Sequence, residues 1–258
     1  MKTITLTTDW GLKDHYLANV KGYLYSQISD VSVIDISHLV SKFNIVEGAF
    51  ILKNSYYTFP KGTIHIISIK DQWTEKNPHL LLKYNEHYFI GTDTGIFSLI
   101  LDGDKPELII ELDIIQETEC FTFPAKDVFA KVACQILNGK DIKSMGQVKE
   151  NILECYLPKP TIHEDCIIGN IIYFDDFQNA ITNIKEDLFK KVIGNKKFTI
   201  YLSRMDGITK ISDSYNDVDP DVEVAVFSST GHLEIAMNNS TAKSLLGLDT
   251  STSIRIEF

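Results

Sequence analysis

The chain has 258 residues and a mass of 29.2 kDa, enough to bury a core as one large domain or two small ones. Hydrophobic residues make up 44% and charged residues 23%, an ordinary globular composition that excludes intrinsic disorder as the main state. The net charge of -10 disfavours nucleic acid and anionic membrane as partners, because phosphate groups bind to basic patches. No apolar run approaches the roughly 18 residues of a membrane-spanning helix.

The N-terminal residues 1–6 lead straight into a strand pattern, and we see no secretory signal there. None of the cysteines sits in a Cys-x-x-Cys pair, which disfavours a zinc ribbon or a redox motif. We therefore expect free thiols and a cytoplasmic protein. The cysteines are Cys120, Cys134, Cys155 and Cys166.

The first half of the chain alternates strand and helix signals. Apolar residues at helical spacing predict helices, the last of them ended by Gly139. This alternation predicts an α/β domain over residues 1–157 with a largely parallel sheet. The expected strands are 4–7, 31–36, 63–69, 80–82 and 87–90, and the expected helices are 16–24, 46–50 and 126–138.

The second half has mostly strand signals. Pro158-Lys159-Pro160 marks a boundary or linker, and several of the later segments alternate apolar and polar residues with a period of two. We expect a smaller all-β domain of barrel or sandwich type over residues 161–258. Its expected strands are 167–174, 197–202, 222–227, 232–237 and 253–258, with short helices near 186–192 and 241–246.

A candidate ligand site follows the first strand at Thr8-Asp9-Trp10-Gly11, with Asp14 close behind. Ligands bind at the carboxyl ends of strands in parallel α/β sheets, and a carboxylate there can accept hydrogen bonds from a ribose diol. Alternatively, Asp9 or Asp14 caps the helix that follows. From the spacing alone, capping is the better interpretation.

The C-terminal half contains a second candidate, in which Asp175, Phe177 and Asn179 follow a strand. Acid and amide groups beside an aromatic ring could bind an amino-acid ammonium, with Asp175 as its counter-charge. A polar hairpin turn explains the same residues, and spacing alone favours the turn. The segments 228–231 and 238–240 are likewise turn-like or helix-capping in composition.

Several common site motifs are missing from the sequence. The histidines show no metal-binding spacing, so we expect no metal site. There is no Gly-x-Gly-x-x-Gly or phosphate-loop pattern, and no Gly-x-Ser-x-Gly elbow. A Rossmann cofactor, a nucleotide triphosphatase and a serine hydrolase are therefore disfavoured.

Taken together, these segments resemble one family along nearly the whole chain, the S-adenosyl-L-methionine hydroxide adenosyltransferases, which are related to the fluorinases and chlorinases. The matching segments come in the family's order, and their number and spacing carry the resemblance. They are 8–11 with Asp14, 21–22, 35–38, 59–65, 91–95, 122–123, 127–130, 175–179, 182–183 and 228–236.

The resemblance implies hydrolysis of S-adenosyl-L-methionine to adenosine and L-methionine, by attack of water or hydroxide at the ribose 5′ carbon and without a cofactor. It also implies a homotrimer whose sites lie between the N-terminal domain of one copy and the C-terminal domain of a neighbour. In the N-terminal domain, Asp9 would hold the ribose hydroxyls and Asp14 would help to bind the methionine end. Phe43 would lie against the ligand.

In the C-terminal domain, the resemblance assigns Asp175 and Asn179 to the methionine or adenine side of the ligand. Phe177 would pack nearby, and Ser229 and Asn239 would contact adenine.

The sequence departs from the family where the hydrolytic members handle water. An ungapped count places the family's aspartate on Lys70, and Asp71 comes one residue late. The family's arginine is missing, and Pro124 replaces its histidine. Either Lys70, Asp71 and His79 form a rearranged catalytic set, or the protein binds S-adenosylmethionine or adenosine without turning it over. An unrelated α/β interaction protein is the third alternative.

Overall fold

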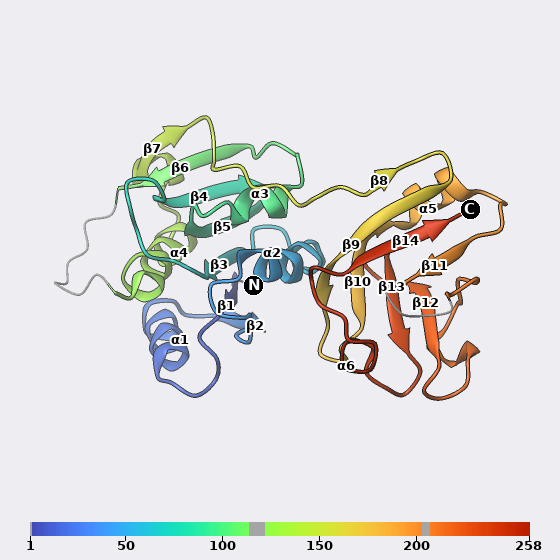
Figure 1. Cartoon of the computed structure of the whole chain (residues 1–258). Helices are drawn as coiled ribbons and strands as arrows, with labels where there is room; N and C mark the ends of the chain where they lie inside the picture. Colours follow the sequence, from blue (N-terminus) through green and yellow to red (C-terminus); the bar gives the residue numbers. More distant parts are fainter. Residues whose placement is uncertain (1, 114–121, 203–206) are drawn as a thin grey trace. The chain divides into compact units, whose positions relative to one another are not determined.

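The computed structural model describes residues 2–113, 122–202 and 207–258 (Figure 1). The chain divides into two compact units, Met1–Tyr156 and Leu157–Phe258, and each is described here by itself. No helix in the described residues combines the length and hydropathy that a bilayer crossing would require.

The N-terminal unit contains a sheet with helices on both faces. Within the described residues, its strands are ordered β2-β1-β3-β5-β4-β6-β7. In chain order, the elements are β1 (Lys2–Thr8), α1 (Tyr16–Gln27), β2 (Val31–Ser37), α2 (Ile45–Lys53), η1 (Tyr56–Thr58), β3 (Ile64–Ser68), β4 (His79–Tyr84), β5 (His87–Thr92), α3 (Ile96–Leu101), β6 (Leu108–Leu112), η2 (Ala125–Ala130), α4 (Lys131–Leu137), η3 (Ile142–Met145) and β7 (Gly146–Lys149).

This sheet is mixed, so the prediction of a largely parallel sheet is wrong in that respect. Strands β2, β1, β3 and β5 are parallel neighbours, whereas β4, β6 and β7 are joined by antiparallel pairing. The cause lies in the turn between β4 and β5, where Asn85 and Glu86 have φ values of 50° and 63°. Two successive positive φ angles form the tight hairpin turn that reverses the chain.

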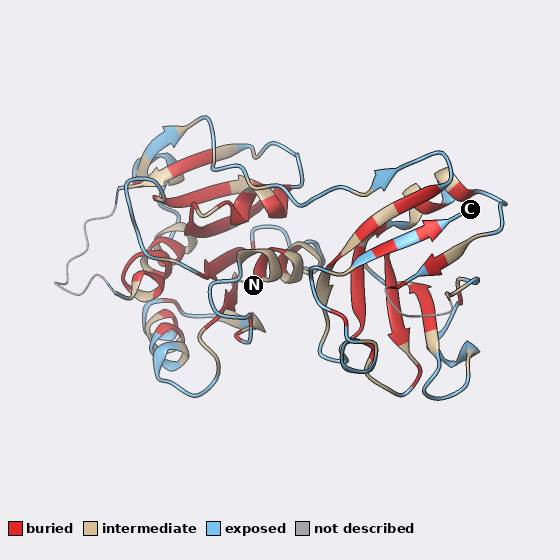
Figure 2. Ribbon diagram, viewed as in Figure 1, coloured by how far each residue is buried: buried red, intermediate tan, exposed pale blue. Residues whose placement is uncertain are grey.

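The two faces of the sheet bury separate apolar clusters. Ile4, Leu6 and Ile66 point toward α1, η2 and α4, and neighbouring positions such as Ile67 and Phe89 pack against α2 and α3. Figure 2 shows the central strands as almost wholly buried. Because both faces are covered, these strands are nearly continuous apolar runs, which is why the sequence predicted them.

The helix predicted at 126–138 is present but irregular. It starts as the π-helical turn η2 and continues as α4, and Gly139 follows with a φ of 82°. The capping interpretation of Asp9 and Asp14 is wrong, because α1 begins after His15 and no side chain caps it. The sequence interpretation also missed α3, β6 and β7.

The C-terminal unit consists mainly of antiparallel strands, in the order β11-β14-β9-β10-β13-β12, with β8 paired to β9. Isolated bridges join Ile208 to β11 and Ile211 to β12, so that the sheet curls on itself. The elements are β8 (Thr161–Ile162), β9 (Cys166–Phe174), β10 (Ala180–Lys185), α5 (Glu186–Ile193), β11 (Thr199–Tyr201), η4 (Tyr215–Asp217), β12 (Glu223–Phe227), β13 (His232–Met237), α6 (Ala242–Leu245) and β14 (Ser253–Glu257).

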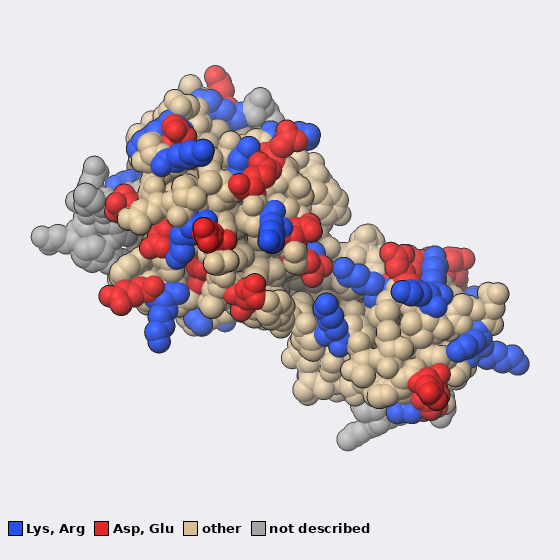
Figure 3. All heavy atoms as spheres, turned by 90° about the horizontal axis from the view of Figure 1, so that it is seen from above, with Lys and Arg blue, Asp and Glu red and all other residues tan. Residues whose placement is uncertain are grey.

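The inner face of this sheet buries its own core, which includes Ile167, Ile235 and Ile256. The strands and both short helices predicted for this half are confirmed, because each lies within a few residues of an element in the structure. On the face that Figure 3 shows, basic and acidic side chains are interspersed over each unit.

Candidate active site

One edge of the N-terminal sheet collects the polar groups of the candidate site. The parallel strands β1, β2, β3 and β5 all end there, at Thr8, Ser37, Ser68 and Thr92. His79 begins β4 at the same edge, because β4 runs antiparallel and pairs His79 with Thr92. Strand ends expose polar groups that the ladder no longer pairs, so this edge is suited to bind a ligand.

Asp9 follows β1 directly and is buried, with 7% of its surface exposed. Its Oδ2 accepts a hydrogen bond of 2.8 Å from the backbone N–H of Phe43, and its carbonyl oxygen accepts one from Nζ of Lys42. Phe43 has a φ of 63° and a largely exposed ring. A carboxylate can accept about four hydrogen bonds, so Asp9 retains acceptor capacity for a ligand.

Asp71 lies at the same edge, just beyond β3. Its Oδ2 accepts a hydrogen bond from Oγ of Ser68. Its carbonyl oxygen accepts bonds from Oγ1 of Thr92, at 2.8 Å, and from Nε2 of His79, at 3.1 Å. The carbonyl is an acceptor only, so Nε2 of His79 carries the proton. The loop at Asp71 is thereby attached to two neighbouring strands.

Burial sets the ionisation of these groups. Burial raises the pKa of Asp71, and the negative charge of Asp9 raises it further, against the hydrogen bond from Ser68. Burial also lowers the pKa of His79, which favours the neutral ring that donates to Asp71. A half-buried carboxylate with a raised pKa, such as that of Asp71, is a suitable proton acceptor for water.

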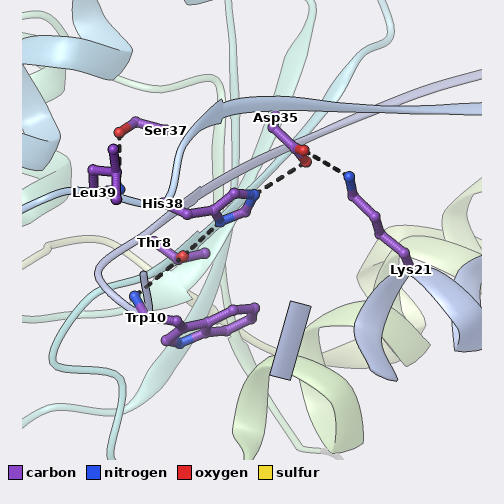
Figure 4. Close-up of polar contacts among 7 residues, drawn as sticks. All are labelled: Thr8, Trp10, Lys21, Asp35, Ser37, His38 and Leu39. Atoms are coloured by element: carbon purple, nitrogen blue, oxygen red, sulfur yellow. Dashed lines mark hydrogen bonds and ion pairs between the residues drawn. The ribbon is translucent and has the colours of Figure 1, made fainter. Parts of the chain in front are cut away.

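A chain of polar contacts begins at Thr8, the residue before Asp9 in the sequence (Figure 4). Oγ1 of Thr8 lies 2.8 Å from Nδ1 of His38, and Nε2 of His38 lies 3.1 Å from Oδ1 of Asp35. Lys21 completes the chain with a contact of 2.6 Å to Oδ2 of Asp35. Burial raises the pKa of Asp35, but hydrogen bonds from Lys21 and His38 outweigh it and hold this pKa below its usual value. The ring of Trp10 stacks on His38.

In the C-terminal unit, Asp175 and Asn179 face each other across the turn between β9 and β10. Oδ1 of Asp175 accepts a bond of 2.7 Å from the backbone N–H of Asn179, and Oδ2 accepts one of 3.1 Å from its side-chain amide. The turn interpretation is therefore correct. Asp175 remains half-buried, so its charge is available to a ligand as well.

A second acid lies close to Asp175. Glu234, on β13, is buried and accepts a bond of 2.7 Å from the hydroxyl of Tyr215. Burial raises the pKa of Glu234, and the charge of Asp175 contributes in the same direction. Two neighbouring carboxylates favour a bound cation, because each disfavours the other's charge.

Family models match both units. The model of the SAM hydroxide adenosyltransferase N-terminal domain matches residues 4–146, and that of the C-terminal domain matches residues 169–255. The chain belongs to the SAM hydroxide adenosyltransferase family.

Two named proteins and one solved structure are similar to this chain over nearly its full length. A protein of Methanocaldococcus jannaschii named (R)-S-adenosyl-L-methionine hydrolase is 28% identical, over 98% of this chain and 95% of its own. One of the same name from Thermus thermophilus is 24% identical, over 99% and 100%. The crystal structure of an uncharacterized conserved protein from Thermotoga maritima superposes with a TM-score of 0.88 at 25% identity, covering 100% of both chains.

Of the residues predicted for the N-terminal part of the site, the structure brings Asp9, Phe43, Asp71 and His79 to the family member's strand edge. Lys70 is exposed, in a left-handed conformation with a φ of 52°, directly before the half-buried Asp71. Asp14 is exposed in the segment before α1.

In the C-terminal part, Asp175 and Asn179 are in direct contact, as described above. Phe177 is 77% exposed at the tip of the same turn. Ser229 is exposed in the turn between β12 and β13, and Asn239 is exposed after β13 with a φ of 54°.

The sequence interpretation missed several polar residues of these clusters. Ser68 lies next to the end of the predicted strand 63–69 and Thr92 lies two residues beyond the predicted strand 87–90, so the strand-end rule applied to Asp9 would have found them. Glu234 has no such signal, because it lies within a strand. In the part of the chain that the structure describes, no group of three or more His, Cys, Asp or Glu side chains could hold a metal ion.

Proposed function

We propose that this protein hydrolyses S-adenosyl-L-methionine to adenosine and L-methionine. Membership of the SAM hydroxide adenosyltransferase family supports the reaction, as do the names of the relatives. The observation that carries the proposal is the pair of acids at one strand edge, the buried Asp9 and the half-buried Asp71. One acid can bind the ribose while the other accepts the proton of water.

The reaction balances without a cofactor. The oxygen of water forms a bond to the ribose 5′ carbon while the carbon–sulfur bond breaks, and its electron pair leaves with the neutral methionine thioether. One proton is released, and we assign its acceptance to Asp71. A hydroxide-like nucleophile and a sulfonium neutralise each other in the transition state, so a dry pocket favours the reaction.

The remaining roles follow the chemistry of each group. Asp9 accepts hydrogen bonds from the ribose hydroxyls, with Phe43 against the ligand and Asp14 toward its methionine end. Asp175 and Asn179 take the methionine ammonium or the adenine side, with Phe177 beside them. His79 and Thr92 hold the main chain at Asp71. Ser229 and Asn239 contact adenine.

We also propose a homotrimer in which each site combines the N-terminal unit of one copy with the C-terminal unit of a neighbour. The distribution of the candidate residues over both units supports this arrangement. A cytoplasmic location is consistent with the free thiols of Cys134, Cys155 and Cys166.

The test is to incubate the purified protein with each sulfonium epimer of S-adenosyl-L-methionine and to separate the products by chromatography. We expect stoichiometric adenosine and methionine. Calorimetric binding without products would instead support a protein that binds the ligand and does not hydrolyse it. Neither binding nor products would favour an interaction protein of the same fold.

A further inference from the structure

The proposed reaction does not use the polar chain next to Asp9, which runs from the buried Thr8 and His38 to Asp35 and Lys21 at the surface. His38 is 3% exposed and Thr8 is fully buried, and the proposed reaction assigns neither of them a contact with the ligand. The contacts nevertheless have one consistent direction. Oγ1 of Thr8 accepts from the backbone N–H of Trp10 at 3.5 Å, and we assign the Thr8 hydroxyl proton to Nδ1 of His38. Nε2 then carries the ring proton and lies 3.1 Å from Oδ1 of Asp35, in contact with it but outside hydrogen-bond geometry.

His38 contacts the turn after β1 in three ways. Besides the bond through Thr8, its ring stacks on Trp10, with centroids 6.2 Å apart and planes inclined by 13°. Its carbonyl oxygen accepts a bond of 2.7 Å from the N–H of Gly11. Asp9 lies between the residues held by these contacts, so the position of its carboxylate depends on them.

The pairing of β1 with β2 is irregular at the same place. Leu6 pairs with Asp35 and Thr7 pairs with Ser37, which leaves Ile36 as an extra residue in β2. A bulge of this kind bends a strand and re-aims the side chains that follow it. The contacts from His38 span the bulge, because Asp35 precedes it and Gly11 lies beyond the end of β1.

We propose that His38 is a positioning residue, held by Asp35 and Lys21, that acts through Thr8 and Trp10 to fix the carboxylate of Asp9 for the ribose. This inference rests on the proposed function for the identity of the ligand. It concerns residues that would not touch the ligand, and it differs from a packing role because its effect must pass through Asp9.

The test compares two threonines of the same strand. Thr8→Val removes the hydroxyl that contacts His38, and Thr5→Val removes an equivalent hydroxyl, which lies 2.7 Å from Nδ1 of His65. Both positions are fully buried. Losing the bond should weaken adenosine binding and raise KM by about five- to tenfold in Thr8→Val, with kcat changed less. Thr5→Val should leave both unchanged.

Two histidine variants separate the two sides of the ring. The amide oxygen of Asn in His38→Asn can take the place of Nδ1 and accept from Thr8. The amide nitrogen of Gln in His38→Gln can take the place of Nε2 in its contact with Asp35. If the effect runs through Thr8, His38→Asn retains more binding than His38→Gln.

A double-mutant cycle decides whether the effect passes through Asp9. Thr8→Val should weaken adenosine binding in the native background and have no further effect in an Asp9→Ala background. An equal loss in both backgrounds, or the same loss in Thr5→Val, would overturn the proposal and leave a general packing role.

Hydrogen exchange keeps the inference separate from the proposed function. If the native protein binds neither adenosine nor S-adenosylmethionine, the proposed function fails, but the positioning of the turn can still be measured. We then expect the amides of residues 9–11 to exchange faster in Thr8→Val than in Thr5→Val. Equal exchange would overturn the positioning role as well.

Discussion

The two acids of the strand edge have different surroundings. Asp9 is buried and accepts hydrogen bonds from a backbone amide and a lysine, and its carboxylate can accept more. Asp71 is desolvated and bonded to Ser68, and burial raises its pKa. Environments that separate two acids in this way commonly separate their roles. Asp9 is suited to binding and Asp71 to proton transfer.

Replacing Asp71 by Asn should remove the proton acceptor while retaining most of the hydrogen bonding. We expect kcat to fall by about 10²- to 10⁴-fold, as for the loss of a general base, with little change in KM. In the native enzyme, kcat should rise with pH through a pKa above 3.8, because only the ionised acid accepts a proton. A pH–rate profile checks this. A kcat for Asp71→Asn equal to that of the native protein would show that Asp71 is not the proton acceptor.

Replacing Asp9 by Asn keeps an oxygen for the Phe43 amide but removes the charge. The loss of charge-assisted bonds, about 1.5–3 kcal/mol, should weaken adenosine binding by roughly 10- to 100-fold in calorimetry. The same change removes a negative charge near Asp71. The acid limb of the pH–rate profile should therefore move to lower pH, and a shift to higher pH would contradict this arrangement.

Between the sheet strands, a histidine pair occupies core positions. Nε2 of His65 on β3 lies 3.1 Å from Nδ1 of His87 on β5, and the His65 ring stacks on Phe89. Burial, followed by the charge of His87, lowers the pKa of His65 from 6.5 to about 3, and burial lowers that of His87. The folded sheet therefore holds the imidazole of His65 in its neutral form.

This pair makes a prediction about acid stability. The unfolded chain binds protons at His65 below its ordinary pKa of 6.5, whereas the folded chain does so only near 3. The contribution of His65 to the free energy of unfolding is full above pH 6.5 and is lost as pH falls toward 3. Urea unfolding at a series of pH values should show that the free energy of unfolding falls less over this range in His65→Gln than in the native protein. Parallel curves would contradict the prediction.

At the scale of the whole molecule, the candidate residues divide between two units that each have their own core. Neither unit contains a complete set, because the acids of the strand edge belong to one and the Asp175 cluster to the other. An assembly that combines units of different copies would complete the site.

The proposed trimer predicts a mass of about three times 29.2 kDa in solution, which light scattering after gel filtration measures. Asp9→Ala and Asp175→Ala are each inactive in the proposed scheme. If sites combine two copies, mixing the two variants under conditions that allow subunit exchange should restore part of the activity. A monomeric, active protein would contradict the shared site.

Short-range patterns in the sequence determined the two halves, most of the strands and the position of Asp9 after β1. Those features depend on local periodicity and on apolar runs, which a single stretch of chain contains in full. The order of family motifs likewise needed only the sequence, and the family models confirmed it.

The tertiary structure decided what depends on long-range pairing. Lys70 has a left-handed backbone conformation directly before Asp71, which lies at the strand edge of the candidate site. The antiparallel β4 brings His79 to the Asp71 carbonyl. Glu234 approaches Asp175 only because β13 pairs with β10. Strand neighbours arise from the whole sheet, since each pairing is stabilised by contacts between residues far apart in the chain.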